Sequence, residues 1–296
     1  MGILSFFKKN KLPEEAPKQE TAIPPEMDRI VQEFTEQTIQ PTLSLKAVRG
    51  GTTVFSSKFG GTPYLPQGFA YPHNEDSTSD KKPLKLLAQL NFTELPPLPG
   101  FPAQGILQFY VAYEEKDDVQ GLDFDNPISQ GGFRIIYHKD IVLDESLLQE
   151  PPALEDAADV YFPFKGEFAL IAEPVRQAMS PNDFRFDAAF LKTYERYLPT
   201  DKQRVWELDS TVNDIISDTF SGTGHRIGGY PFFTQEDPRG YGKYEDYTFL
   251  LLQIDSDGRG DDEIIWGDCG VANFFITPEQ LKACDFTKVL YNWDCY

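Results

Sequence analysis

Short apolar runs bounded by turn residues recur along this chain, and each is about as long as a β-strand. Runs of this kind indicate buried strands, while Pro-, Gly- and Asp-rich segments such as 94–104 and 255–262 indicate the loops between them. Loops of this length are too long for tight hairpins, but they favour a mostly antiparallel sheet. The predicted strands are 86–91, 105–111, 135–140, 250–255, 270–276 and 289–294.

A helical period replaces this pattern in three places. Between Pro25 and Pro41 the apolar positions recur at three- and four-residue steps, which predicts an amphipathic helix. Two more helical stretches are predicted at 182–197, after the start signal Ser180-Pro181, and at 201–220. The stripe of the first helix consists of Met27, Ile30, Val31, Phe34 and Thr38.

The strand-like runs form two series in the same order, and each series begins with a Gly-Gly turn. The letters GGTPY at 60–64 match GGYPF at 228–232, where two glycines permit a tight turn and Pro then favours an extended segment. Three further pairs of segments match in order: LLAQLN with LLLQID, GILQFYV with GVANFFI, and IIYHKD with VLYNWD. Four ordered matches indicate an internal duplication.

These patterns predict an α+β fold built from two copies of a mainly antiparallel, β-rich unit related by internal duplication. We place the halves at about 42–140 and 221–296, joined by a helical segment at about 151–220. The helices between the halves are expected to pack on the sheets. The whole of 23–296 is predicted to form one domain, and the Pro-, Glu- and Lys-rich residues 1–22 a flexible tail.

Charge excludes one class of partner. The chain of 296 residues carries 47 acidic and 27 basic residues, for a formal net charge of −20. Such a surface repels phosphate backbones, so we expect no nucleic-acid binding. The acidity has two interpretations: a solvated surface without further purpose, or a field that steers a basic protein partner.

Cysteine usage and hydropathy favour a cytoplasmic protein. The three cysteines, Cys269, Cys284 and Cys295, have no paired spacing, which is typical of a reducing compartment. No apolar run approaches the roughly 20 residues of a membrane span, so no stable membrane insertion is expected. The terminus MGILSFFKK places its positive charge after the apolar stretch, the reverse of a signal peptide. A frayed terminus and transient membrane contact both remain open.

Two glutamines repeat at matched positions within apolar strands. A buried amide must satisfy its donors and its acceptor or cost about 1–3 kcal/mol. Gln89 and Gln253 therefore either bind the backbone of their own Gly-Gly turns, bind each other across a pseudo-twofold axis, or contact a polar ligand between the halves.

Three other residues are candidates for a site in a crevice between the halves. His225 precedes the second Gly-Gly turn and could act as an acid or base near Asp268 and Cys269. Arg134 is the basic candidate in the first half. The candidate ligand-binding set is therefore Gln89, Arg134, His225, Gln253 and Asp268.

No metal site or cofactor is predicted. The three histidines have no metal-ligand spacing, and the loop DSDGRGDD at 255–262 has its glycine at the wrong position for a calcium loop. This loop and the acidic segment 114–130 are expected to be solvated, with adventitious cation binding as the alternative. Phosphate-binding and serine-hydrolase motifs are also missing from the sequence, so catalytic residues stay unassigned.

Several of these segments together resemble the YwqG-like family, a bacterial domain of unknown function (family 1963). The similar segments include SKFGGTPYLPQ, GLDFDNP, HRIGGYPFFTQEDPR and IIWGDCGVANFFI, within about 23–296. The resemblance implies a bacterial cytoplasmic protein with a repeated α+β unit, and it carries no catalytic residues. Members of that family are associated with toxin-immunity gene neighbourhoods, so the resemblance favours a binding role.

We therefore expect a non-enzymatic protein-binding module, immunity-like, whose acidic surface engages a basic protein. The alternative is a small-molecule or metal-dependent enzyme with its site between the two halves. The two hypotheses differ in whether the halves leave a polar cleft or close on each other.

Overall fold

The computed structural model describes residues 23–76, 81–113, 119–154, 160–260 and 263–296. In this part of the chain ten strands form one antiparallel sheet, accompanied by four α-helices, which confirms the α+β class and the antiparallel pairing. The predicted tail, residues 1–22, lies outside the described residues. The strands are β1 (Gln40–Arg49), β2 (Lys58–Gly60), β3 (Lys85–Asn91), β4 (Ile106–Val111), β5 (Phe133–His138), β6 (Glu167–Gln177), β7 (His225–Gly228), β8 (Phe249–Asp255), β9 (Val271–Ile276) and β10 (Leu290–Asp294).

Two long strands form the centre of the sheet. β1 and β6 pair along ten residues, and the sheet order is β10-β9-β8-β7-β1-β6-β2-β3-β4-β5. Four strands therefore extend on each side of the centre, and we call β2–β5 the first arm and β7–β10 the second arm. β1 precedes the first arm in the chain but pairs with β7, whereas β6 precedes the second arm but pairs with β2. Each arm is thus completed by the strand that precedes the other arm.

The two arms have the same internal hydrogen-bond register. In the first arm Gln89 pairs with Gln108, and in the second arm Gln253 pairs with Asn273. Both strand pairs contain an irregularity at the same place, between Leu86 and Ala88 and between Leu250 and Leu252. The arms therefore share strand order, pairing and bulge position.

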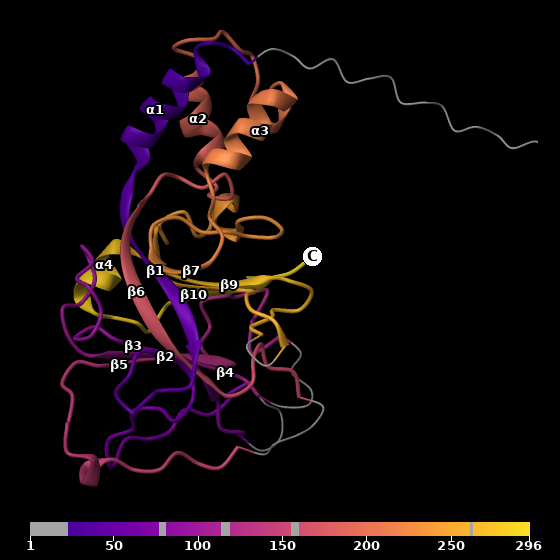
Figure 1. Cartoon of the computed structure of the whole chain (residues 1–296). Coiled ribbons are helices and arrows are strands. Elements are labelled where there is room, and N and C mark those ends of the chain that lie inside the picture. The colour runs from indigo at the N-terminus through magenta and orange to yellow at the C-terminus, as the bar shows by residue number, and fades with distance from the viewer. Residues whose placement is uncertain (1–22, 77–80, 114–118, 155–159, 261–262) are drawn as a thin grey trace, which may run out of the picture.

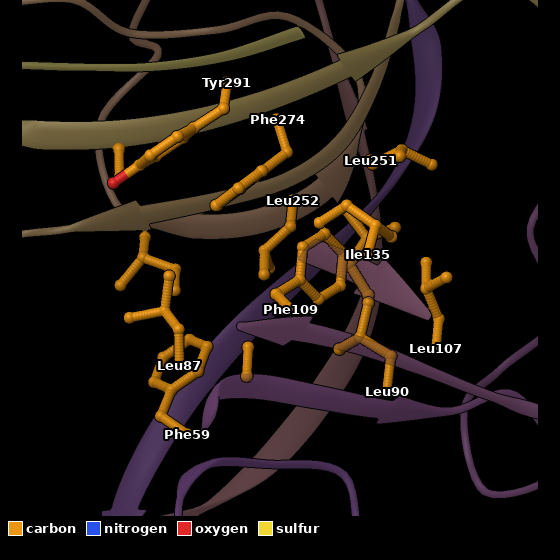
Figure 2. Packing of buried hydrophobic residues seen from close by; sticks show 14 of the residues in the cluster. Phe59, Leu87, Leu90, Leu107, Phe109, Ile135, Leu251, Leu252, Phe274 and Tyr291 are labelled. Atoms are coloured by element: carbon orange, nitrogen blue, oxygen red, sulfur yellow. The ribbon is translucent and has the colours of Figure 1, made fainter. Parts of the chain in front are cut away.

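The arms lie as two layers, crossed by β1 and β6 (Figure 1). Apolar side chains from both layers meet in one core, which includes Leu90 and Phe109 from the first arm and Leu252 and Phe274 from the second (Figure 2). The Phe109 and Phe274 rings are 4.9 Å apart, and Phe274 stacks on Tyr291 at 4.6 Å. The halves close on each other, and apolar side chains fill the space between them.

An α-helix forms within each predicted stretch, although the helices within 182–197 and 201–220 are shorter than predicted, and most of the helices do not cover the sheet. α1 (Met27–Thr38), α2 (Phe186–Tyr194) and α3 (Ser210–Thr219) stand together beyond one end of the sheet (Figure 1). Their apolar stripes meet in a separate core, where the Phe34 ring contacts the rings of Phe186, Phe190 and Phe220 at 5.1–5.2 Å. We call this three-helix unit the cap. The expectation that these helices pack on the sheets is therefore wrong, because their aromatic residues bury one another instead.

The fourth helix is the exception. α4 (Pro278–Ala283) contributes Leu281 to the core between the arms. It starts at Thr277, whose hydroxyl accepts a hydrogen bond from the Gln280 N–H, with Pro278 in the first turn.

The edges of both arms are joined by residues 119–130, the described part of the acidic segment of the first half. The Pro127 carbonyl accepts from the Tyr291 N–H of β10, and the Val119 carbonyl accepts from the Trp293 indole. At the other edge the Gln130 side chain accepts from the Ile135 N–H of β5 and donates to the Phe286 carbonyl. This segment therefore covers part of both edge strands, β10 and β5.

Candidate functional site

A polar cavity of about 250 Å³ lies where the cap meets the second arm. One wall is the loop that starts α2, and the other is the loop after the second Gly-Gly turn, which ends in the short helix η3 (Pro238–Tyr241). We call this cavity the polar pocket. Its lining residues are Pro181, Asn182, Asp183, Phe184, Asp187, Arg204, Gln235, Glu236, Asp237, Gly240 and Tyr241.

Two aspartates shape the walls through local hydrogen bonds. The Asp183 carboxylate accepts from the Arg185 N–H at 3.1 Å, just before α2 begins. The Asp237 carboxylate accepts from the Arg239 N–H at 3.0 Å, caps η3, and accepts from the Phe184 N–H across the pocket at 3.1 Å. Side-chain oxygens thus replace regular backbone partners in both loops and hold the walls together.

A buried charge network supports the floor of the polar pocket: Asp183 and Asp237 line the pocket, whereas their partners Arg239 and Arg185 do not. The Arg239 guanidinium donates to Asp237 at 2.6 Å and to Asp183 at 3.1 Å, and all three side chains are at most 3% exposed. Arg185 adds a two-pronged contact to Asp183 at 2.7 Å. Burial by itself would raise the pKa of Asp183, but the Arg185 hydrogen bond and both guanidinium charges lower it on balance. Two carboxylates therefore face two guanidiniums, so this floor is rigid and close to neutral.

The mouth of the polar pocket has a different character. The Asp187 carboxylate accepts from Arg204 at 3.0 Å and from the Val205 N–H at 2.9 Å, and the Glu236 side chain is exposed. Tyr241 is 69% exposed at the rim. Directly after Arg204 comes the short helix η2 (Val205–Glu207), whose Trp206 is 74% exposed. Two carboxylates against one guanidinium, beside the exposed Tyr241 ring, suit a cationic group of a partner.

Both repeated glutamines form hydrogen bonds with the backbone around their own Gly-Gly turns. The Gln89 amide oxygen accepts from the Tyr64 N–H at 2.9 Å, and its NH2 donates to the Val54 and Ser56 carbonyls. Gln253 makes the matching set: it accepts from the Phe232 N–H and donates to the carbonyls of Gly222 and Gly224. Each amide is fully used by the backbone that enters and leaves a Gly-Gly turn.

His225 is 2% exposed and lies against the Phe59 ring at 5.2 Å. Its Nδ1 accepts from the Asp255 N–H at 3.0 Å, so the proton of the neutral ring is on Nε2, which is 3.8 Å from Asp257. Burial lowers the pKa of His225 to about 4; the Asp257 carboxylate opposes the shift and the Arg226 guanidinium adds to it. A neutral imidazole whose only lone pair is occupied has no free basic nitrogen in this conformation.

The five sequence-predicted residues do not converge. Gln253 and His225 are neighbours, since Gln253 pairs with Arg226, but Gln89 belongs to the other arm. Arg134 is on β5, where its Nε donates to the Gln130 carbonyl. Asp268 is exposed in the turn before β9. The candidates therefore do not form one site.

The sequence-predicted set left out Lys58, which is the counterpart of Arg226 before the first Gly-Gly turn. Its ammonium group is fully buried and donates to the carbonyls of Thr53 and Thr62. Burial lowers the pKa of Lys58 to about 8, opposed by the carboxylates of Glu167 and Glu94. A basic residue two positions before each Gly-Gly turn was the available signal, and the role of Lys58 is to tie its turn together.

Neither a metal site nor a membrane span is found in the described residues. Among them, His, Cys, Asp and Glu side chains do not gather in threes around a possible metal position. The helices of this part of the chain are too short or too polar to cross a bilayer.

Comparison with known families assigns the chain. The model of the family described as "Domain of unknown function (DUF1963)" matches residues 57–295. The chain belongs to this family, which confirms the membership expected from the resemblance. A search of curated proteins finds no match.

Proposed function

We propose that this chain is a non-enzymatic binding module whose polar pocket receives a basic group of a protein partner. The observation that carries the proposal is the mouth of the pocket, where Asp187 and Glu236 outnumber Arg204 and the exposed Tyr241 ring lies at the rim. An immunity-like role in the cytoplasm is one form of this proposal, and it rests on the resemblance alone.

Physical chemistry supports this choice in two ways. A net charge of −20 favours encounters with basic proteins, and such fields raise association rates by about 10- to 1,000-fold. Exposed Tyr and Trp supply large contact areas with few rotatable bonds, which makes them frequent binding hot spots. The buried network of Asp183, Asp237 and Arg239 keeps the walls in place before binding, so little ordering cost remains.

The alternative, an enzyme with its site between the halves, has less support. The space between the arms is filled by side chains such as Phe109, Leu252 and Phe274. The charged groups on the floor of the polar pocket are paired with each other. An enzyme hypothesis would need a reactive group elsewhere in the molecule.

A capture experiment from native lysate tests the proposal. Immobilised protein should retain a basic partner at low salt and release it at high salt, because exposed charges are screened. The double variant Asp187→Asn, Glu236→Gln should weaken retention about tenfold or more, while each substitute keeps the size and an amide oxygen.

The matched control removes two exposed acidic charges elsewhere, with Asp140→Asn and Glu150→Gln. It should leave retention nearly unchanged, since it alters only the long-range field. Equal retention by both double variants would exclude the polar pocket as the contact. A chain that retains no salt-sensitive partner at all would contradict the binding role.

We also propose that the two arms descend from one duplicated unit of five strands, β1–β5 and β6–β10, whose first strands have exchanged. Supporting this are the shared strand order, the equivalent glutamine pairs and the equal bulges of the two arms. Alignment of the arms across family members is the test: residue types should match better at these structural equivalences than at shifted ones.

A further inference from the structure

Three cavities adjoin the Pro-rich loop, residues 92–104, which connects β3 and β4. Their volumes are about 230, 300 and 400 Å³. Phe101 lines all three, and Leu98 lines the first two. The polar pocket shares no lining residue with them, so this is a separate region of the molecule.

The 230 Å³ cavity reaches the centre of the sheet. Leu43 of β1 and Ile227 of β7 form part of its lining, and both belong to the core between the arms. The Pro-rich loop supplies the opposite side through Phe92, Leu95 and Leu98. The cavity therefore lies against the outside of the main hydrophobic core, next to this loop.

The loop is held at both ends by hydrogen bonds. At its start the Phe92 N–H donates to the Gly105 carbonyl, and Glu94 accepts from the Ser57 N–H. At its end the Tyr137 hydroxyl donates to the Gln104 carbonyl. The fixed φ of its prolines limits collapse further. These prolines are Pro96, Pro97, Pro99 and Pro102.

The linings indicate which molecules fit. The 230 Å³ and 300 Å³ cavities are lined by no charged residue, and their polar side chains are Thr93 in the first and Gln40 and Thr248 in the second. An ion would lose its hydration here without gaining a counter-charge. Each volume is several times the roughly 30 Å³ of a water molecule, and an apolar cavity of about 150 Å³ can hold benzene.

We propose that these two cavities form a binding site for a small, uncharged, apolar molecule that carries a ring. The ring lies between the Pro-rich loop and the β1–β7 floor, against Phe101 and Leu98. Burial of apolar surface drives binding, and the missing charges select against ions. The site does not depend on the proposed protein partner.

Fluorescence titration with the neutral naphthalene dye prodan tests the site. The full-length chain should bind it saturably with one-to-one stoichiometry. Naphthalene should displace the dye, and the anion 2-naphthoate should do so at least about tenfold less well, because it would be desolvated without a counter-charge.

Ala103→Trp places a large ring at an exposed lining position of the 230 Å³ cavity, and it should weaken dye binding at least about tenfold. Ala70→Trp makes the same change at an exposed alanine outside both linings and should leave binding unchanged. Circular dichroism shows that both variants fold. The proposal is overturned if the dye does not bind saturably or if the two variants bind it equally. It is also overturned if self-association of the chain displaces the dye.

Discussion

The amide of Gln89 shows how a single side chain can organise a turn. Its oxygen accepts from Tyr64 and from the Gln108 amide, while its NH2 group donates to two carbonyls. Asn273 in the second arm takes the place of Gln108, donating to the Phe232 carbonyl as Gln108 does to Tyr64. Each Gly-Gly turn is therefore built on a pair of strand amides.

The same equivalence explains His225. In the first arm the Ser57 hydroxyl accepts from the Asn91 N–H, and in the second arm His225 Nδ1 accepts from the Asp255 N–H. The ring is larger than the hydroxyl and extends to Phe59. His225 therefore occupies a structural acceptor position, which it fulfils only as the neutral ring.

Acid should destabilise the protein through this histidine. The folded pKa of His225, about 4, lies below its ordinary value of 6.5, so its contribution is present above pH 6.5 and is lost as the pH falls toward 4. The full loss is on the order of 3 kcal/mol. His138 shifts in the same direction, also to a pKa of about 4 through burial, and adds to the effect.

Urea unfolding at pH 7 and near pH 4 measures this dependence. His225→Asn keeps an acceptor but does not titrate, so the difference in unfolding free energy between the two pH values should shrink by about 2–3 kcal/mol. His73→Asn, at a half-buried histidine, is the control. An unchanged difference in His225→Asn would show that this group does not carry the pH dependence.

At the level of elements, the long central strands were missed because they do not read as buried runs. β1 alternates Leu43, Leu45 and Ala47 with polar residues, and much of β6 is exposed. Pro41 and Pro174 also argue against a central strand, because Pro cannot donate to the ladder. The fully buried strands β3, β4, β8 and β9 were predicted within a residue at each end.

The segment 119–130 is an element whose role only the fold reveals. Its acidic composition indicated a solvated loop. In the structure, however, Gln130 joins Ile135 of β5 to Phe286, which follows α4 in the chain. Gln130 is half-buried and uses both ends of its amide, so one side chain couples the two arms.

Gln130→Ala should therefore destabilise the fold by about 1–3 kcal/mol, because the Ile135 N–H and the Phe286 carbonyl both lose their partner. Urea unfolding measures the loss, and hydrogen exchange at the Ile135 amide should become faster. Gln104→Ala, at an exposed glutamine, should cost little. A loss no larger than that of the control would contradict the coupling role.

For the molecule as a whole, the net charge of −20 affects folding and binding in opposite ways. The excess of 47 acidic over 27 basic residues produces a net self-repulsion that destabilises the compact state. Salt screens this repulsion, but it screens the buried ion pairs around Arg239 only a little. Added salt weakens attraction to a basic partner while it relieves the repulsion.

The midpoint of thermal unfolding should rise with ionic strength. Between about 0.01 M and about 0.5 M NaCl we expect a gain on the order of 1 kcal/mol, or about 2 °C. Differential scanning calorimetry measures the rise, and retention of the partner over the same range should fall. If the unfolding midpoint falls with salt, attractive surface pairs outweigh the net charge.

The sequence by itself determined the fold class, six strands, the three cap helices and the family, because these depend on local period and on motifs that lie close together in the chain. The tertiary structure alone decided where the elements go. It brought Asp183 to Arg239, paired β1 with β7 and β6 with β2, and placed the cap helices off the sheet. Contacts between residues distant in the chain depend on packing and burial, which no local pattern records.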